Sequence, residues 1–434
     1  MEKRDIRRRD VLRATGAAGL IGLAGCSGGD TTNDGGDSSG DSGGDSGGET
    51  TESSSGGDGG QSVFKVGMAD SLSGSLSTFG QRNQRGKKIA LEAVNEVGVK
   101  GGELEILTED TQSTSQGGVS AAQKLVNQDQ VPLLIGAVGS GVSIAIHKSV
   151  TQNTDVVQIS QNSTSPQLTQ YPDLLRMSPT GRTQSTALAD LISGDGHDSV
   201  AISWINNDYG QGIAEAFVEA YDGEVAYNNP HDQGKASYSN VITSMADSGA
   251  DAWLFVTYQP EFSTMSQEAF DKGYTEEAQW YGGDSVKGPK VLNNAPEGSL
   301  DGMKVVAPSA ALNQDNYKEF ASTFEERHGS APTAWSAYAY DAVITTALAV
   351  QAADEFTGAA LKEVVRDVTR PEGEKVTSYA DAHEILANGG SPSDVNYEGV
   401  SGPIDLDENG DPKGFLQVFT VSDHAYESTG FVSS

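Results

Sequence analysis

The sequence predicts an α/β protein built on mostly parallel sheets, and two observations in residues 62–434 support this prediction. Short apolar runs typical of strands alternate with segments whose apolar residues recur at helical spacing. This part of the chain is also long enough for two domains of ordinary size. Strands that alternate with helices favour βαβ units, in which ligands bind outside the carboxyl ends of the strands.

The expected elements follow in chain order. The predicted strands are Val63–Met68, Leu104–Leu107, Val131–Ile135, Val156–Ile159, Val200–Ile205, Ala252–Val256, Met303–Val306 and Phe415–Val421. Two apolar stripes at helical spacing lie between the first three strands: Ile89, Ala90, Ala93, Val94 and Val97, then Val119, Ala122, Leu125 and Val126. The chain from about 313 to 370 is predicted to be mostly helical, and no internal repeat is visible.

Residues 1–26 have the layout of an export signal. The stretch Arg8-Arg9-Asp10-Val11-Leu12-Arg13 resembles a twin-arginine signal, and the apolar run that follows is too short to span a bilayer. It ends in Leu23-Ala24-Gly25-Cys26, which resembles a lipoprotein cleavage site with Cys26 as the lipid-bearing residue. We therefore expect export and a lipid anchor on the outer face of the cell membrane. The alternative is a chance cysteine behind an ordinary signal peptide.

Residues 27–61 are predicted to be a disordered acidic tether. Positions 27–60 contain only Gly, Ser, Thr, Asp, Glu and a single Asn. A segment with no apolar side chain to bury cannot offset the entropy cost of its own ordering.

The charge of the chain is strongly negative. It carries 28 Lys and Arg against 61 Asp and Glu, a net charge of −33, which becomes −36 without residues 1–26. Such a surface repels phosphates and excludes a nucleic-acid partner. Because the acids are spread along the chain, we expect a halophilic protein that stays in solution in concentrated salt, where self-repulsion is screened.

A loop of small residues interrupts the run LLIGAVGSGVSIAI, residues 133–146. A strand that stops just before a helix exposes backbone N–H groups, which favour an anion. A dinucleotide is disfavoured, because Ile144 stands where the third glycine of its fingerprint would be. A carboxylate held by the Ser140 hydroxyl fits better. A plain tight turn without a ligand stays open at this point.

Eight stretches of the chain resemble, in order, the branched-chain amino acid binding proteins of ABC importers. The first covers residues 64–110, and the others include KLVNQDQVPLLIGAVGSGVS, ISQNSTSP, NNDYGQGIAEAF, SGADAWLFVTYQPE, QWYGGDS, AYAYDAV and GVSGPIDLDENGDPKGF. The resemblance spans nearly all of residues 62–422. It implies a type I periplasmic-binding fold with two α/β lobes and three crossovers. We expect residues 62–178 plus 309–400 in the first lobe, and 179–308 plus 401–434 in the second.

The resemblance also implies binding residues in the first lobe. Ser140 and Thr164 would hold the carboxylate of the ligand, and the backbone of Asn162 would take its ammonium. Phe79 stands where the family places an aromatic wall. Gln161 and Ser163 depart from the Pro and Ala expected there, so we expect a pocket more polar than is usual in the family.

In the second lobe, the resemblance implies that Tyr209 and Tyr258 close over the ligand, whereas Asp284 meets the ammonium. The family commonly has the longer Glu at the position of Asp284. The alternatives are packing roles for the two tyrosines and a turn for Asp284. A zwitterion needs acceptors for its cation and donors for its anion, with an apolar slot between them.

No catalytic site, cofactor or metal is predicted. The stretch from Asp405 to Asp411 resembles a calcium loop, but Leu416 replaces the bidentate glutamate, so a tight turn between strands is favoured. The six histidines are scattered, and His147, near the predicted binding loop, is expected at the surface. The chain therefore offers no nucleophile and base at recognisable spacing, which argues against an enzyme.

The resemblance implies an extracytoplasmic solute-binding protein, which delivers an amino acid by hinge closure to the permease and ATPase subunits of an importer. Two alternatives stay open: a ligand-sensing subunit of a signalling receptor, and binding of an amide or another small carboxylic acid.

Overall fold

The computed structural model describes residues 62–433. The predicted export signal, the lipid site at Cys26 and the tether over 27–61 lie outside the described residues. Within 62–433, no helix combines the length and the apolar character needed to cross a bilayer. The described strands form a five-stranded sheet, a seven-stranded sheet and a small three-stranded sheet.

The first sheet is parallel throughout, in the order β2-β1-β3-β4-β5. Its strands are β1 (Val63–Asp70), β2 (Glu103–Asp110), β3 (Leu133–Gly136), β4 (Val157–Ser160) and β5 (Leu174–Arg176). All five carboxyl ends therefore meet at one edge of the sheet, as the βαβ pattern predicts.

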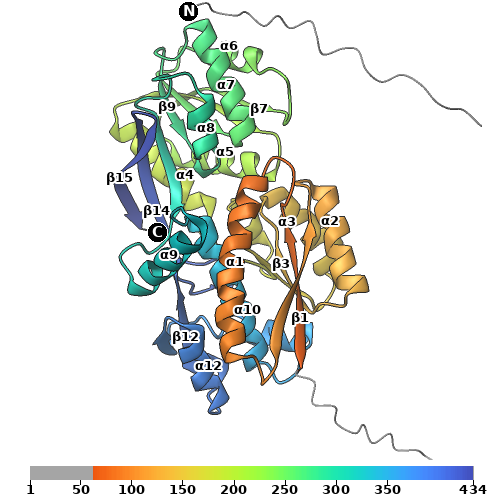
Figure 1. Cartoon of the computed structure of the whole chain (residues 1–434). Helices are drawn as coiled ribbons and strands as arrows, with labels where there is room; N and C mark the ends of the chain where they lie inside the picture. The colour runs from red at the N-terminus through yellow and green to blue at the C-terminus, as the bar shows by residue number, and fades with distance from the viewer. Residues whose placement is uncertain (1–61, 434) are drawn as a thin grey trace, which may run out of the picture. The chain divides into compact units, whose positions relative to one another are not determined.

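Helices cover both faces of this sheet. The helices α1 (Ser77–Val97) and α10 (Ala334–Ala352) lie side by side over one face, and α2 (Ser115–Gln123) and α3 (Ser140–Ile146) lie over the other (Figure 1). Leu133 and Ile135 of β3 belong to the same apolar cluster as Val94 of α1, whereas Leu134 packs with the α2–α3 side. Successive side chains of a strand point to opposite faces, so a strand covered twice is apolar throughout.

The second sheet has the order β15-β14-β10-β9-β8-β6-β7, and β14 and β15 run antiparallel to their neighbours. Its strands are β6 (Ser199–Ile205), β7 (Glu224–His231), β8 (Ala252–Val256), β9 (Gln279–Gly282), β10 (Lys304–Ser309), β14 (Phe415–Ser422) and β15 (Ala425–Ser433). One face packs on α4 (Gly181–Gly194) and α5 (Asp208–Ala220). The other packs on α6 (Ser239–Asp247), α7 (Gln259–Lys272) and α8 (Pro289–Asn294).

The chain passes between the two sheets three times. It leaves β5 for α4 and returns after β10 to α9 (Asp315–His328), α10, α11 (Gly358–Val364) and α12 (Tyr379–Ala387). The small sheet of β11 (Glu374–Val376), β12 (Val395–Gly399) and β13 (Gly402–Pro403) follows before the chain enters β14. This is the two-lobed arrangement that the resemblance implies, and the residue limits given above for each lobe stay a prediction.

Each predicted strand overlaps an observed one, but several strands were not predicted. Of these, β7 and β15 lie at the two edges of the second sheet. Most side chains described in these edge strands are exposed or half-buried, so they lack the apolar run that marks a central strand. In α1, Ala90 and Val94 are buried as predicted, whereas Val97 is 41% exposed at the end of the helix.

Candidate ligand-binding site

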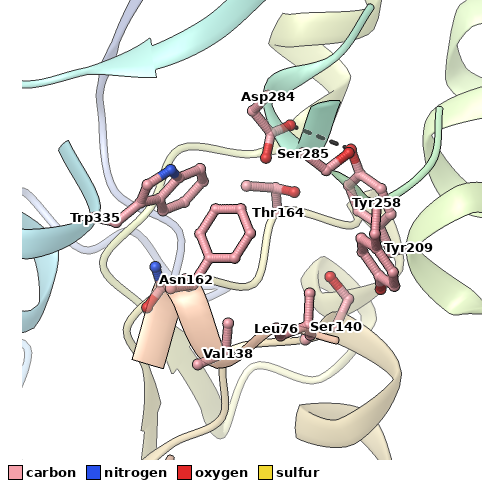
Figure 2. Close-up of a pocket in the computed structure, with 12 residues that line it drawn as sticks. Leu76, Val138, Ser140, Asn162, Thr164, Tyr209, Tyr258, Asp284, Ser285 and Trp335 are labelled. Carbon is pink, nitrogen blue, oxygen red and sulfur yellow. Dashed lines mark hydrogen bonds between the residues drawn. The ribbon is translucent and has the colours of Figure 1, made fainter. Parts of the chain in front are cut away.

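One pocket brings together all seven of the predicted binding residues. It encloses about 330 Å³ of empty space, part of which is open to solvent. Its lining consists of loops and first helical turns, all of which follow strands of the two sheets except the start of α10: Leu76, Phe79, Val138, Gly139, Ser140, Asn162, Thr164, Tyr209, Tyr258, Asp284, Ser285 and Trp335. Figure 2 shows Asp284 at one end of this pocket and Ser140 towards the other.

Hydroxyl groups line the Ser140 end of the pocket. The Ser140 Oγ atom accepts a hydrogen bond of 3.1 Å from the backbone N–H of Ser165, so its own proton is free to be donated elsewhere. The Thr164 hydroxyl has no protein partner within residues 62–433, and its backbone oxygen accepts from Gly181 at 2.6 Å. Two hydroxyl donors therefore face a space that an anionic group can enter.

Asn162 is the least satisfied polar side chain of the pocket. Its residue is 5% exposed, and both carboxamide atoms, Oδ1 and Nδ2, are buried without a hydrogen-bond partner in the described part of the chain. A buried amide without partners costs free energy, so such a group normally meets a ligand or a water molecule. The resemblance pointed to the backbone of Asn162, whereas its side chain is the group that lacks partners.

Asp284 provides a buried carboxyl group at the opposite end. Gln184 Nε2 donates to its Oδ1 atom at 2.8 Å, and Tyr209 lies 3.3 Å from the same oxygen. The Tyr209 hydroxyl is closer to Ser285 Oγ, at 2.7 Å, and its single proton cannot serve both acceptors fully. Burial raises the pKa of the Asp284 carboxyl to about 6, and these two hydrogen bonds offset only part of that effect.

Tyr209 and Tyr258 form one wall of the pocket. Their rings are stacked, with centroids 5.6 Å apart and an interplanar angle of 17°. Asn207 holds both residues, because its Oδ1 atom caps the first turn of α5 at the Tyr209 N–H while its Nδ2 atom donates to the Tyr258 hydroxyl at 3.1 Å. The tyrosines therefore present a fixed surface to the pocket.

Phe79 and Trp335 form an aromatic wall. They meet edge to face, with ring centroids 5.7 Å apart. Trp335 was not predicted, and neither was Gln184, which orients Asp284. Trp335 stands two residues before the recognised stretch AYAYDAV, so its position next to that stretch was the available signal. Gln184 lies within α4 and had no distinguishing pattern around it.

Three expectations for neighbouring residues are corrected by the structure. Gln161 and Ser163 do not line the pocket, so they do not make it more polar. The Gln161 amide lies 3.5 Å from Asp70, and the Ser163 hydroxyl bonds to Ser143 at 2.8 Å beneath the binding loops. His147 is not at the surface but buried, with its Nδ1 atom 3.1 Å from Thr151 Oγ1. It lies on the inner side of the helical segment that continues α3.

The acidic loop before β14, residues 405–411, forms a turn in which the carboxylates of Asp407 and Asp411 already have protein partners. Asp407 accepts hydrogen bonds from the backbone N–H groups of Asn409 and Asp411. The Asp411 carboxylate pairs with the buried Arg176 at 2.6 Å and with Thr169 at 2.7 Å. Within the described chain, no group of three or more His, Cys, Asp or Glu side chains is placed to hold a metal ion.

Comparisons with known proteins agree with this architecture. Residues 63–388 match the periplasmic binding protein family. The chain is similar to a Leu/Ile/Val-binding protein homolog of Brucella melitensis, with 27% identity over 48% of this chain and 58% of that protein. It is also similar to a leucine-, isoleucine-, valine-, threonine- and alanine-binding protein of Pseudomonas aeruginosa, with 24% identity over 85% of this chain and 91% of that one.

Solved structures of similar fold have different ligands in their descriptions. A leucine binding protein from Thermotoga maritima matches with a TM-score of 0.74 and 24% identity, over 86% of this chain and 99% of that one. A solute binding protein of an ABC transporter from Rhodopseudomonas palustris, in complex with 3,4-dihydroxybenzoic acid, matches with a TM-score of 0.70 and 18% identity, over 86% and 97%. These likenesses confirm the predicted fold class, and each of these relatives is described as a binding protein.

Proposed function

The chain belongs to the periplasmic binding protein family, and we propose that it is the extracytoplasmic solute-binding protein of an ABC importer, with an amino acid as its solute. Permease and ATPase subunits would be its partners. The observation that carries this proposal is the pairing, within one small pocket, of the Asp284 carboxyl with the Ser140 and Thr164 hydroxyls. This arrangement suits a zwitterion, whose ammonium needs an acceptor and whose carboxylate needs donors.

Binding is expected to draw the two lobes together. Ser140 and Thr164 follow strands of the first sheet, whereas Tyr209, Tyr258 and Asp284 follow strands of the second. Only a closed conformation, in which the residues from both sheets approach the solute, makes all of these contacts. The solute therefore binds this form more tightly and shifts the population towards it.

A small aromatic acid is the second candidate solute. Phe79, Trp335 and the stacked tyrosines offer flat apolar faces on which an aromatic ring can pack. Such a solute would use the hydroxyls of Ser140 and Thr164 but would bring no ammonium for Asp284. The two candidates therefore differ in their need for one carboxylate.

Calorimetry with L-leucine and its deaminated analogue, 4-methylpentanoate, distinguishes the two candidates. If the solute is a zwitterion, Asp284→Asn weakens L-leucine binding by about 2–5 kcal/mol, the scale for removing one partner of a buried charge pair. The analogue loses far less, because it never contacts Asp284 through an ammonium. Ser140→Ala weakens both ligands, since both carry the carboxylate.

The matched control is Asp190→Asn, which removes the same charge from an exposed position of α4. It should leave the affinity for both ligands unchanged. Equal losses for L-leucine and 4-methylpentanoate in Asp284→Asn would contradict the zwitterion proposal. An aromatic acid such as 4-hydroxybenzoate that binds the wild type and Asp284→Asn equally well would favour the second candidate.

We also propose that Cys26 carries the lipid that holds the protein at the membrane. The support is the sequence Leu23-Ala24-Gly25-Cys26 behind a twin-arginine signal. Cys26→Ser should release the protein into the medium, as measured by fractionation of membranes. A mutant that still sediments with membranes to the same extent as the parent would rule out this anchor.

A further inference from the structure

A second and larger cavity adjoins the binding pocket. It holds about 870 Å³ of empty space and shares two of its lining residues, Asp284 and Trp335, with that pocket. Besides the shared Asp284, its charged lining residues are two cations: Arg82 of α1 and Lys287, the residue after the short helical turn Asp284–Val286. One cation therefore comes from the side of the first sheet and the other from the side of the second.

Neither cation has an acidic partner within residues 62–433. Both are half-buried, yet no ion pair or side-chain hydrogen bond joins either of them to a carboxylate. The chain has more than twice as many acidic residues as basic ones, and some buried or half-buried cations elsewhere are paired, such as Arg176 with Asp411 and Lys304 with Asp195, whereas others, such as Arg85 and Arg366, form no ion pair within residues 62–433. A lack of available acids therefore does not explain the two unpaired cations.

The charge of Arg82 also acts on Lys287. Burial and, to a smaller extent, the neighbouring charge of Arg82 together lower the pKa of Lys287 to about 8. Burial likewise lowers the pKa of Arg82. Two like charges that face one cavity repel each other, and an anion placed between them would relieve this repulsion.

Aromatic rings support Lys287 but leave its hydrogen-bond donors unused. Its Nζ atom lies 3.9 Å from the ring centre of Phe419 and 5.3 Å from that of Tyr426. The rings stabilise a cation without accepting its three N–H bonds in the way a carboxylate does. On the opposite side, the Arg82 guanidinium carbon lies 5.8 Å from the ring centre of Phe79.

A third polar group in the cavity also lacks a partner. The Oγ1 atom of Thr333, which lies just before α10, is buried and has no hydrogen-bond partner in the described chain. Hydroxyls donate readily to anionic oxygens, and a buried hydroxyl is normally satisfied. Cations from both sides and an unused hydroxyl thus line the same space.

We propose that this cavity is an anion subsite, in which Arg82 and Lys287 together hold a carboxylate or a comparable oxyanion. This inference rests on the proposed function, because it takes the solute to be an amino acid. If the anionic group belongs to the solute, the solute is an amino acid with a second acidic group that reaches past Trp335. If the group is a free oxyanion, it bridges the two sides and supports closure around a neutral amino acid.

Calorimetry at constant ionic strength tests the subsite with pairs of amino acids that differ only in distal charge. The probes are L-glutamate against L-glutamine, L-2-aminoadipate as a longer acid, and inorganic phosphate with and without L-leucine. The variants are Arg82→Gln and Lys287→Gln. Their controls, Lys88→Gln on α1 and Lys290→Gln on α8, remove the same charge from exposed positions outside the cavity.

With a solute-borne anion, the wild type and both controls bind one of the acidic amino acids at least about tenfold more tightly than L-glutamine. Arg82→Gln and Lys287→Gln lose this preference while their affinity for L-glutamine stays within about twofold. With a free oxyanion, phosphate raises the melting temperature and the L-leucine affinity of the wild type, but not those of the two variants.

The subsite is contradicted if Arg82→Gln and Lys287→Gln bind the acidic amino acids with the same preference as the wild type and also respond to phosphate in the same way. The proposed function fails independently, if no amino acid binds the wild type at all. In that case, a phosphate effect that is lost in both variants and kept in both controls would still establish the anion subsite. The two failures therefore give different results.

Discussion

At the scale of single residues, Asp284 shows how a proposed binding group can oppose stability. The residue is 5% exposed, and the two described side-chain donors, Gln184 and Tyr209, both reach the same oxygen, Oδ1. Desolvation therefore favours the neutral acid, which raises the pKa of this carboxyl from 3.8 to about 6. At neutral pH the group is charged without a cation beside it, and an ammonium from the solute would supply that cation.

The pH dependence of stability follows from this shift. A folded-state pKa above the unfolded value means that the native state binds the extra proton, so stability falls as pH rises from about 4 to about 6. Above that range the ionised Asp284 costs the ligand-free protein about 3 kcal/mol, at about 1.4 kcal/mol per pKa unit. Asp284→Asn should therefore be the more stable protein at neutral pH and lose this advantage near pH 4.

Thermal unfolding of the ligand-free protein at both pH values measures this effect. Asp190→Asn, which removes a charge from an exposed position, should change stability by less than about 0.5 kcal/mol at either pH. If Asp284→Asn is destabilised at neutral pH without ligand, the carboxylate would have a structural rather than a binding role.

At the scale of elements, the contact of α1 with α10 decides where two pocket residues lie. Phe79 is in the first turns of α1 and Trp335 is in the first turn of α10, and the two rings meet edge to face. The helices approach closely at Gly86, where an added Cβ would lie 2.1 Å from the backbone oxygen of Ser336. No side chain fits there without moving one helix away from the other.

Gly86→Ala should therefore destabilise the protein, although alanine is the better helix former by about 1 kcal/mol at an unhindered site. The displacement of α1 should also weaken ligand binding, because Phe79 would move relative to Trp335. Gly194→Ala at the end of α4 is the control, since no atom lies within 4 Å of its added Cβ. It should stabilise by up to about 1 kcal/mol.

Denaturant unfolding of the two alanine variants, with calorimetry of the bound solute, compares these outcomes. Equal stabilisation by both substitutions would contradict this prediction, because it would show that α1 and α10 can move apart at Gly86 without a loss of stability.

At the scale of the whole molecule, the net charge of −33 governs behaviour in salt. Most of the described ion pairs lie at exposed or half-exposed positions, so they offset little of this repulsion. The screening length is about 3 Å at 1 M salt and about 10 Å at 0.1 M. Carboxylates on neighbouring elements therefore repel one another far more in dilute salt.

We predict that the melting temperature falls as the salt is lowered from molar to millimolar concentration, and that cooperative unfolding is lost at the lower end. Circular dichroism melting curves across a series of sodium chloride concentrations measure this. A parallel series in sucrose, a neutral osmolyte, separates charge screening from general stabilisation. The same melting temperature at both extremes of salt would contradict the halophilic interpretation.

The sequence alone determined features that depend on local pattern. Central strands such as β3 and β8 are covered on both faces, so they are apolar throughout and can be located within two or three residues. Ser140, Thr164, Tyr209 and Tyr258 follow such strands, and parallel strands bring their carboxyl ends to one edge of each sheet. Asp284 follows β9, which was not predicted, and was identified through the family resemblance. Pattern and family resemblance together therefore identified residues that the structure gathers around one pocket.

Other features were decided only by tertiary structure, because they depend on contacts between distant segments. Trp335 and Gln184 reach the pocket from α10 and α4, and Arg82 faces Lys287 across some two hundred residues of chain. No local signal marks a side chain whose surroundings come from the other end of the sequence. His147 was expected at the surface, but packing around the continuation of α3 buries it, and its ring nitrogen shares a hydrogen bond with Thr151 that makes burial tolerable.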